Sequence, residues 1–287
     1  MGFDAVAMVE RLVQKSYEMQ TRNADDYIGD DGLLHCGVCW QPKEAYVTYN
    51  LPSGPKTLKV PTECACAYAK RAEKERALAV REKEQELADL RRRSYMDSKY
   101  DEARFETSDV KDKPFLMCKQ YADKFDQMLQ GNHGLLLWGD VGTGKTYAAA
   151  CIANQLLDQG IPVIMTSFVD LFRMMSSDPD AENNLINRMQ RSRLVIFDDI
   201  GAERKTFYAL EKVYNLVDIR YKARKPMIFT TNLTREEMIR EEDPRLKRIY
   251  DRALEVCFPI HFKGNNYRRA AARERFAEVK ELLEGGQ

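Results

Sequence analysis

A glycine-rich segment near the middle of the chain has the residue types and spacing of a phosphate-binding loop. An apolar run, residues 135–138, leads directly into a G-x-x-x-x-G-K-[ST] pattern. Glycines in such a loop let backbone N–H groups close around phosphate oxygens. Lys145 can reach the β- and γ-phosphates, and the Thr146 hydroxyl can bind Mg²⁺. The predicted nucleotide-binding residues are Gly139, Asp140, Val141, Gly142, Thr143, Gly144, Lys145 and Thr146.

Two later apolar runs end in polar side chains suited to phosphate chemistry. Residues 194–197 are followed by Asp198 and Asp199, and residues 227–231 are followed by Asn232. The carboxyl ends of parallel strands lie beside the phosphate loop in α/β sheets. Asp198 is therefore predicted to hold Mg²⁺. Asp199 is placed to orient or deprotonate the attacking water, and Asn232 to sense the γ-phosphate or position that water.

Four cysteines in the N-terminal part have a spacing typical of a zinc site. Cys36 and Cys39 have the spacing of a zinc knuckle, and Cys64 and Cys66 follow a predicted hairpin with its turn at residues 52–55. The hairpin would bring the pairs together, as in a zinc ribbon. We predict a structural zinc with four protein ligands and no catalytic role. The second pair has one intervening residue instead of two, so His35 remains an alternative ligand.

The composition limits the classes of function. The chain has 287 residues, of which 44% are hydrophobic, enough for a core. Lysine plus arginine and aspartate plus glutamate number 45 each, so nucleic-acid binding would have to come from local patches. Seven cysteines, an odd number, argue against a disulfide framework. The chain shows neither a signal peptide nor an apolar run that could span a bilayer, so we expect a cytoplasmic protein without a membrane partner.

The periodicity predicts three parts. Residues 1–68 form a helix and the zinc module, residues 69–99 a charged, solvated linker helix, and residues 100–287 a nucleotide-binding domain. In the third part, apolar strands alternate with amphipathic helices, which predicts an α/β doubly wound parallel sheet. One continuous helix is expected before the phosphate loop. The predicted strands cover residues 135–138, 162–167, 194–197, 227–231 and 255–262.

Taken together and in order, four motifs resemble the AAA+ ATPases of the DnaC/DnaI replicative helicase loaders, to which the transposition helper IstB is closely related. The resemblance covers residues 100–287, and a cysteine-bearing module before the ATPase is similar to that of loaders of the DnaI kind and their phage counterparts. The motifs are GDVGTGKT (139–146), VIFDDIGAE (195–203), FTTNL (229–233) and RIYDR (248–252).

The resemblance implies an AAA+ P-loop NTPase with a five-stranded parallel sheet and a reduced lid, which binds ATP and assembles into a ring or spiral. Asn232 would be sensor 1, and Arg268 sensor 2. Arg252 would be the arginine finger given in trans to a neighbouring subunit's ATP, with Arg248 as the alternative. Asp199 stands where many AAA+ enzymes carry Glu, a feature that the loaders share. We therefore expect hydrolysis to be slow without a partner or DNA.

The resemblance also implies partners. The N-terminal module would grip a hexameric replicative helicase. The helices within residues 168–191 sit where initiator and loader ATPases insert an element for single-stranded DNA, and Arg188, Arg191 and Arg193 cluster there. Arginines on a solvated helix are an equally good explanation of that cluster. The leading hypothesis is ATP-dependent loading of the helicase onto single-stranded DNA. The alternatives are an IstB-like transposition helper and an ATP-switched adaptor with incidental hydrolysis.

Overall fold

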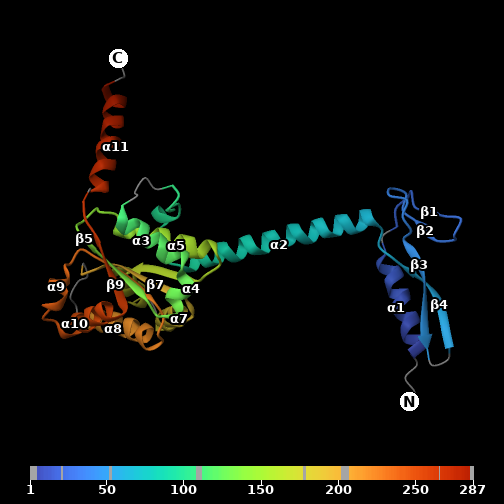
Figure 1. The fold of residues 1–287 in the computed structure, drawn as a ribbon, viewed down its shortest axis with the longest axis horizontal. Coiled ribbons are helices and arrows are strands. Elements are labelled where there is room, and N and C mark those ends of the chain that lie inside the picture. The colour runs from blue at the N-terminus through green and yellow to red at the C-terminus, as the bar shows by residue number, and fades with distance from the viewer. Residues whose placement is uncertain are drawn as a thin grey trace. The chain divides into compact units, whose positions relative to one another are not determined.

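The chain divides into two compact units, residues 1–84 and residues 85–287, in a computed structural model (Figure 1). The boundary falls inside one long helix, α2 (Ala65–Arg93), which contributes residues to both units. The structure describes residues 5–20, 22–51, 54–107, 112–176, 179–201, 207–264 and 266–284. Parts of two predicted features, the hairpin turn at 52–53 and residues 202–203 of the second motif, lie outside these ranges.

The N-terminal unit is built around an antiparallel hairpin. Its elements are α1 (Ala5–Met19), β1 (Tyr27–Ile28), β2 (Leu34–His35), β3 (Glu44–Leu51) and β4 (Gly54–Pro61). Helix α1 is tied to the hairpin by the Tyr17 hydroxyl, which donates to the Lys59 carbonyl at 3.2 Å. Among the side chains described in this unit, the buried apolar ones are Leu34, Cys36 and Cys64. A core this small gives little hydrophobic stabilisation, so the unit needs another source of stability.

The second unit contains the predicted five-stranded parallel sheet, in the order β6-β7-β8-β5-β9. Its strands are β5 (Gly134–Gly139), β6 (Val163–Ser167), β7 (Leu194–Ile200), β8 (Met227–Thr231) and β9 (Cys257–Phe262). Alternate residues of each strand enter opposite cores, because side chains alternate across a sheet. Leu135 and Leu137 pack with α5 on one face, and Leu136 packs with α8 and α10 on the other. The α/β fold expected from the sequence is confirmed.

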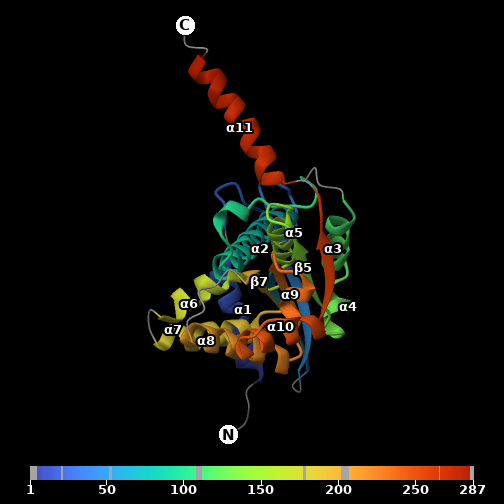
Figure 2. The ribbon, with the colours of Figure 1, turned by 90° about the vertical axis from the view of Figure 1, so that its left-hand side faces the viewer.

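Helices cover both faces of this sheet. Helices α3 and α5 lie on one side, and α8 and α10 lie on the other (Figures 1 and 2). After β9, the residues that are described form one helix, α11, which agrees with a reduced lid. Along the described ranges, no helix has the length and apolar character needed to cross a bilayer. The helices are η1 (Ser98–Tyr100), α3 (Lys113–Asp123), α4 (Phe125–Gln130), α5 (Lys145–Asp158), α6 (Phe168–Ser176), α7 (Pro179–Arg191), α8 (Phe207–Lys222), α9 (Arg235–Ile239), α10 (Pro244–Val256) and α11 (Tyr267–Glu284).

Three predicted boundaries were wrong. The linker helix expected over residues 69–99 is α2, which begins at Ala65 and ends at Arg93. The single helix expected before the phosphate loop is broken at Lys124, whose φ of −109° and ψ of 25° are not helical. Next to the break, Phe125 is buried beside Tyr121, with ring centroids 6.1 Å apart. The fifth strand begins at Cys257 and not at Glu255, because α10 continues to Val256. Helix boundaries depend on packing that local periodicity does not contain.

Candidate functional site

The phosphate-binding pattern forms the turn between β5 and α5. Gly139 has a φ of +138°, and a Cβ atom there would lie 2.1 Å from the carbonyl oxygen of Phe262 on β9. Gly144, with a φ of +93°, is the N-cap of α5. Both positions therefore need glycine. The N-terminal end of α5 faces the same turn, and its free N–H groups and dipole favour an anion.

A pocket of about 510 Å³ opens beside this turn. It brings together side chains from β7, β8 and the starts of α5 and α11, which are far apart in the sequence. Nine predicted site residues line it: Val141, Gly142, Gly144, Lys145, Thr146, Asp198, Asp199, Asn232 and Arg268. Helix α11 is held to the loop because the Tyr267 N–H donates to the Gly142 carbonyl at 2.9 Å. This contact places Arg268 at the pocket.

Lys145 is held at the centre of the pocket by three acceptors. Its Nζ donates to the carbonyl oxygens of Gly139 and Asp140, each at 2.7 Å, and to Oδ1 of Asn232 at 2.9 Å. Burial lowers the pKa of Lys145 from its ordinary value. A buried ammonium group needs anionic or polar partners. Phosphate oxygens of a nucleotide are suitable partners, and the side chain is already aimed at the loop.

The two carboxylates lie at a β-bulge at the end of β7. The β7–β8 register shifts between Phe197 and Ile200. Asp199 has a φ of +54°, an uncommon conformation for a residue other than glycine. Its carboxylate accepts a hydrogen bond from Nδ2 of Asn232 at 3.0 Å. Asn232 thus links Lys145 to Asp199. Bulges redirect side chains and are frequent beside active sites.

The oxygen atoms near the loop fit a magnesium ion. Asp198 and Thr146 both line the pocket, and the nearby Thr146 side chain favours the charged form of the Asp198 carboxyl. Burial raises the pKa of Asp198 above its ordinary value, although the hydrogen bond from Thr230 and the nearby Thr146 side chain oppose this shift. Hard oxygen donors, together with substrate phosphates, are the ligands that Mg²⁺ prefers.

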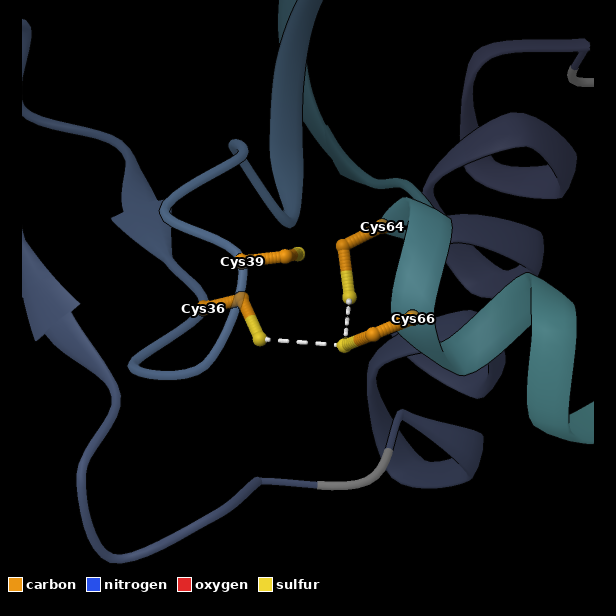
Figure 3. Close-up of side chains that lie close together, drawn as sticks. All are labelled: Cys36, Cys39, Cys64 and Cys66. Atoms are coloured by element: carbon orange, nitrogen blue, oxygen red, sulfur yellow. Dashed lines mark hydrogen bonds between the residues drawn. The ribbon is translucent and has the colours of Figure 1, made fainter.

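The four cysteines of the N-terminal unit converge on one point (Figure 3). Their sulfur atoms all lie within 4.8 Å of one another. Cys36 and Cys39 lie on the turn after β2, Cys64 lies just before α2, and Cys66 lies in its first turn. Hydrogen bonds from the backbone N–H groups of Cys66 and Gln41 lower the pKa of Cys39 to about 6. Four sulfur donors this close together fit a tetrahedral zinc ion.

The alternative ligand His35 is engaged elsewhere. Its Nδ1 lies 3.0 Å from the Trp40 carbonyl oxygen, and its Nε2 lies 3.0 Å from Oδ2 of Asp31. Both ring nitrogens therefore have partners outside the cysteine cluster. The four sulfur atoms form a complete donor set without the imidazole.

Comparisons with known proteins agree with this architecture. The chain matches the family of IstB-like ATP binding proteins over residues 74–275. It belongs to this family. Among curated proteins, it is 30% identical to the replicative helicase loader DnaC of Escherichia coli over 42% of this chain and 50% of that protein. It is 28% identical to the replicative helicase loader DnaI of Bacillus subtilis over 58% of each chain. It is 29% identical to the phage-like element PBSX protein XkdC of Bacillus subtilis, over 53% of this chain and 59% of that one.

Solved structures support the same fold for the IstB-like domain. A crystal structure of DnaI matches with a TM-score of 0.51 and 23% identity, over 60% of this chain and 94% of that chain. A crystal structure of the DnaC helicase loader matches with a TM-score of 0.50 and 21% identity, over 58% and 100%. The domain thus shares the fold of these two loader structures. The chain spans half to three fifths of the length of the curated relatives above.

The arginines of α10 lie outside the nucleotide pocket of this IstB-like domain. Arg252 donates from Nη2 to the Tyr214 hydroxyl at 2.9 Å and pairs with Asp218 at 2.5 Å. Its guanidinium also lies 4.6 Å from the centroid of the Tyr214 ring, and the side chain is largely buried. Arg248 is exposed, 5.9 Å from the centroid of the same ring. Arg252 and Arg248 are both candidates for the arginine finger.

The predicted DNA-contacting arginines lie around the end of α7. Arg188 and Arg191 are in its last turn, and Arg193 follows just before β7. The Arg188 guanidinium donates to the Tyr95 hydroxyl at 2.6 Å, and Arg188, Arg191 and Arg193 are all exposed. All three side chains thus lie at the surface of the second unit.

Several residues of the nucleotide pocket were not predicted. Lys99 and Tyr100 of η1 and Tyr267 of α11 line it, and no motif marks them. Thr230 also lines it, from β8. A sequence signal existed for this residue, because two consecutive threonines end an otherwise apolar strand directly before Asn232. Only the tertiary structure shows which of the two threonines faces the carboxylates.

Proposed function

We propose that this protein hydrolyses ATP in the pocket beside the phosphate loop, and that it uses the cycle to load a hexameric replicative helicase onto single-stranded DNA. The observation that carries the proposal is the convergence of Lys145, Asp198, Asp199 and Asn232 in one pocket. The similarity of the chain to two replicative helicase loaders, DnaC and DnaI, also supports this proposal.

Each side chain has a role that follows from its contacts. Lys145 binds the β- and γ-phosphates by exchanging its carbonyl partners for phosphate oxygens. Thr146 and Asp198 would hold Mg²⁺, which would supply positive charge to offset that of the phosphates. Asp199 orients or deprotonates the attacking water, and Asn232 fixes the Asp199 carboxylate while it contacts Lys145. Arg268, held at the loop by α11, contacts the phosphates as sensor 2.

The first experiment tests the nucleotide site. We expect Lys145→Ala to weaken ATP binding about tenfold or more and to abolish hydrolysis, because a charge-assisted contact to the phosphates is lost. Lys247→Ala, which removes an exposed lysine of α10, should behave as the wild type. Equal ATP affinity and turnover in wild type and Lys145→Ala would refute the assignment of the pocket.

We further propose that Arg252 acts on the site of a neighbouring subunit, with Arg248 as the alternative. Neither residue lines the pocket of its own chain, and a finger in trans accelerates phosphoryl transfer ~10³–10⁵-fold. Arg252→Ala and Lys145→Ala chains should each be inactive, and a mixture should recover part of the activity. A mixture of Arg248→Ala and Lys145→Ala chains, compared with the first mixture, distinguishes the two arginines. Failure of both mixtures to recover activity would exclude shared sites.

The helicase and DNA assignments need separate tests. The N-terminal module, predicted over residues 1–68, is proposed to bind the helicase, so a chain without it should lose capture by a hexameric replicative helicase. Single-stranded DNA binding should weaken in the double variant Arg191→Ala, Arg193→Ala and become less salt-dependent.

Family membership keeps an IstB-like transposition helper as the second candidate. Capture by a transposase in place of the helicase would favour that candidate, and binding without hydrolysis would favour an adaptor.

A further inference from the structure

The hydroxyl of Thr230 lies between the two acidic residues of the nucleotide pocket. Thr230 is on β8 and is only 1% exposed. Its Oγ1 lies 2.6 Å from Oδ1 of Asp198 and 2.8 Å from the backbone nitrogen of Asp199. One side-chain atom thus contacts the residue proposed to hold Mg²⁺ and the residue proposed to orient the water.

The direction of both hydrogen bonds is fixed by their chemistry. The backbone N–H of Asp199 can only donate, so Thr230 Oγ1 accepts from it. The single hydroxyl hydrogen is then free to be donated to the Asp198 carboxylate. The hydroxyl is therefore oriented, and it holds both residues at once. An alanine or valine side chain at this position has no group that can do the same.

The bulge explains why this contact is needed. Phe197 pairs with Phe229, and the next pair in the ladder is Ile200 with Thr231. Two residues of β7 therefore stand opposite the single residue Thr230, and the regular ladder is interrupted at the carboxylates. The Thr230 side chain supplies the acceptor for the Asp199 N–H. It thereby supports the left-handed backbone conformation that directs Asp199 into the pocket.

We propose that Thr230 is a positioning residue for ATP hydrolysis, which fixes the spacing and orientation of Asp198 and Asp199. This inference rests on the proposed ATPase function. Thr230 acts on the backbone of Asp199, and Asn232 acts on its carboxylate. Two side chains near the end of β8 thus hold the water-orienting residue at two points. Small displacements of a positioned group can cost about 10²-fold in rate.

The neighbouring residue provides a matched control. Thr231 is also fully buried on β8. Its hydroxyl donates to the Ile200 carbonyl at 2.7 Å and accepts from the Leu233 N–H at 3.1 Å. It therefore makes the same two kinds of hydrogen bond without touching either carboxylate. Loss of this hydroxyl should cost stability but should not displace Asp199.

The experiment compares three variants of the full chain: Thr230→Val, Thr230→Ser and Thr231→Val. ATP affinity, kcat and KM are measured with the helicase and single-stranded DNA present, and thermal unfolding is recorded for each variant. We expect Thr230→Val to lower kcat by about 10–100-fold with KM for ATP within about threefold of the wild type. Thr230→Ser keeps the hydroxyl and should stay within about threefold of the wild-type kcat. Thr231→Val should lower the unfolding temperature while its kcat stays near that of the wild type.

Three results would overturn the inference: a wild-type kcat in Thr230→Val, equal losses of kcat in Thr230→Val and Thr231→Val, or a loss in Thr230→Ser as large as in Thr230→Val. If Thr230→Val does not fold, Thr230→Ala removes the same hydroxyl with a smaller side chain and is judged by the same criteria. A wild-type chain that does not hydrolyse ATP would instead refute the proposed function itself.

Discussion

At the scale of the residue, Arg220 is buried among backbone carbonyls. It is 0% exposed, and its guanidinium donates to the carbonyl oxygens of Met189 and Ser192, both at 2.9 Å, Arg193 at 3.2 Å and Pro226 at 2.9 Å. Burial lowers its pKa to about 10, so it stays charged at neutral pH. These bonds connect α8 to the end of α7 and to the residues just before β7 and β8. Those strands carry the carboxylates and Thr230.

We expect Arg220→Met to reduce the free energy of unfolding by about 3 kcal/mol, because several buried carbonyls lose their donor. Urea unfolding followed by Trp138 fluorescence, in a chain that also carries Trp40→Phe, measures this for the second unit. Arg191→Met removes an exposed arginine from α7 and should change stability by less than about 0.5 kcal/mol. Equal stability of the two variants would contradict the role assigned to Arg220.

At the scale of the element, Asn154 fixes the segment before α3 to the helix that follows the phosphate loop. Its Oδ1 accepts from Arg91 of α2 at 2.9 Å, and its Nδ2 donates to the carbonyl oxygens of Tyr100 at 2.7 Å and Ala103 at 3.0 Å. Asn154 is fully buried in α5. The Asn154 side chain thus connects the end of α2, Tyr100 at the nucleotide pocket and α5.

The variant Asn154→Ala should destabilise the second unit by about 1–3 kcal/mol, because buried carbonyls lose their partner. It should also weaken ATP binding, since Tyr100 is no longer held at the pocket. Both effects are measurable by urea unfolding and ATP titration. Gln155→Ala, which removes a hydrogen bond to Asp123 at the surface, is the control. An Asn154→Ala chain with wild-type stability and affinity would show that the amide has no such role.

The N-terminal hairpin should lose stability in acid because of Glu44. Burial alone would raise the pKa of Glu44, but hydrogen bonds from Lys59 and from the Leu34 N–H outweigh it and lower the pKa below 4.5. A carboxylate whose pKa is lower in the folded state than in the unfolded state stabilises the fold at pH values above its unfolded-state pKa. This contribution is lost as the pH falls through the folded-state pKa. Protection factors from amide hydrogen exchange in β3 and β4 should therefore decrease below about pH 4.5.

Glu44→Gln provides the comparison for this pH dependence. The variant should be less protected than the wild type at pH 7 and should change less between pH 6 and pH 3, because the titrating group is gone. A wild-type hairpin whose protection is constant over this range would contradict the assignment.

At the scale of the whole molecule, metal removal should affect one unit only. The described side chains of the N-terminal unit bury few apolar groups, whereas the second unit has a core on each face of its sheet. We propose that zinc on the four cysteines supplies the missing stability, because a structural metal contributes its binding energy to folding. A zinc-selective chelator, used with Mg²⁺ in excess, should abolish amide protection in β3 and β4 and leave protection in β5 and β7 and ATP binding intact.

Elemental analysis decides the same question directly. One zinc per chain is expected in the wild type and none in Cys39→Ser. Cys118→Ala alters a cysteine buried in the second unit and should retain the metal. A wild-type chain without zinc, or a hairpin unaffected by the chelator, would rule out the structural site.

The sequence alone determined the α/β class, the phosphate loop and the strand ends that carry Asp198, Asp199 and Asn232. These features are local, because a glycine pattern and a strand ending in polar residues encode their own geometry. The four cysteines were predicted to lie together from the hairpin between them, and the structure places their sulfur atoms within 4.8 Å of one another. The tertiary structure decided the rest. Four features join segments that are distant in the sequence. They are the β-bulge, the choice of Thr230 over Thr231, the burial of Arg252 against Tyr214 and the contacts of Arg220. The reason is physical, since register, burial and hydrogen-bond partners are properties of packed pairs and not of single segments.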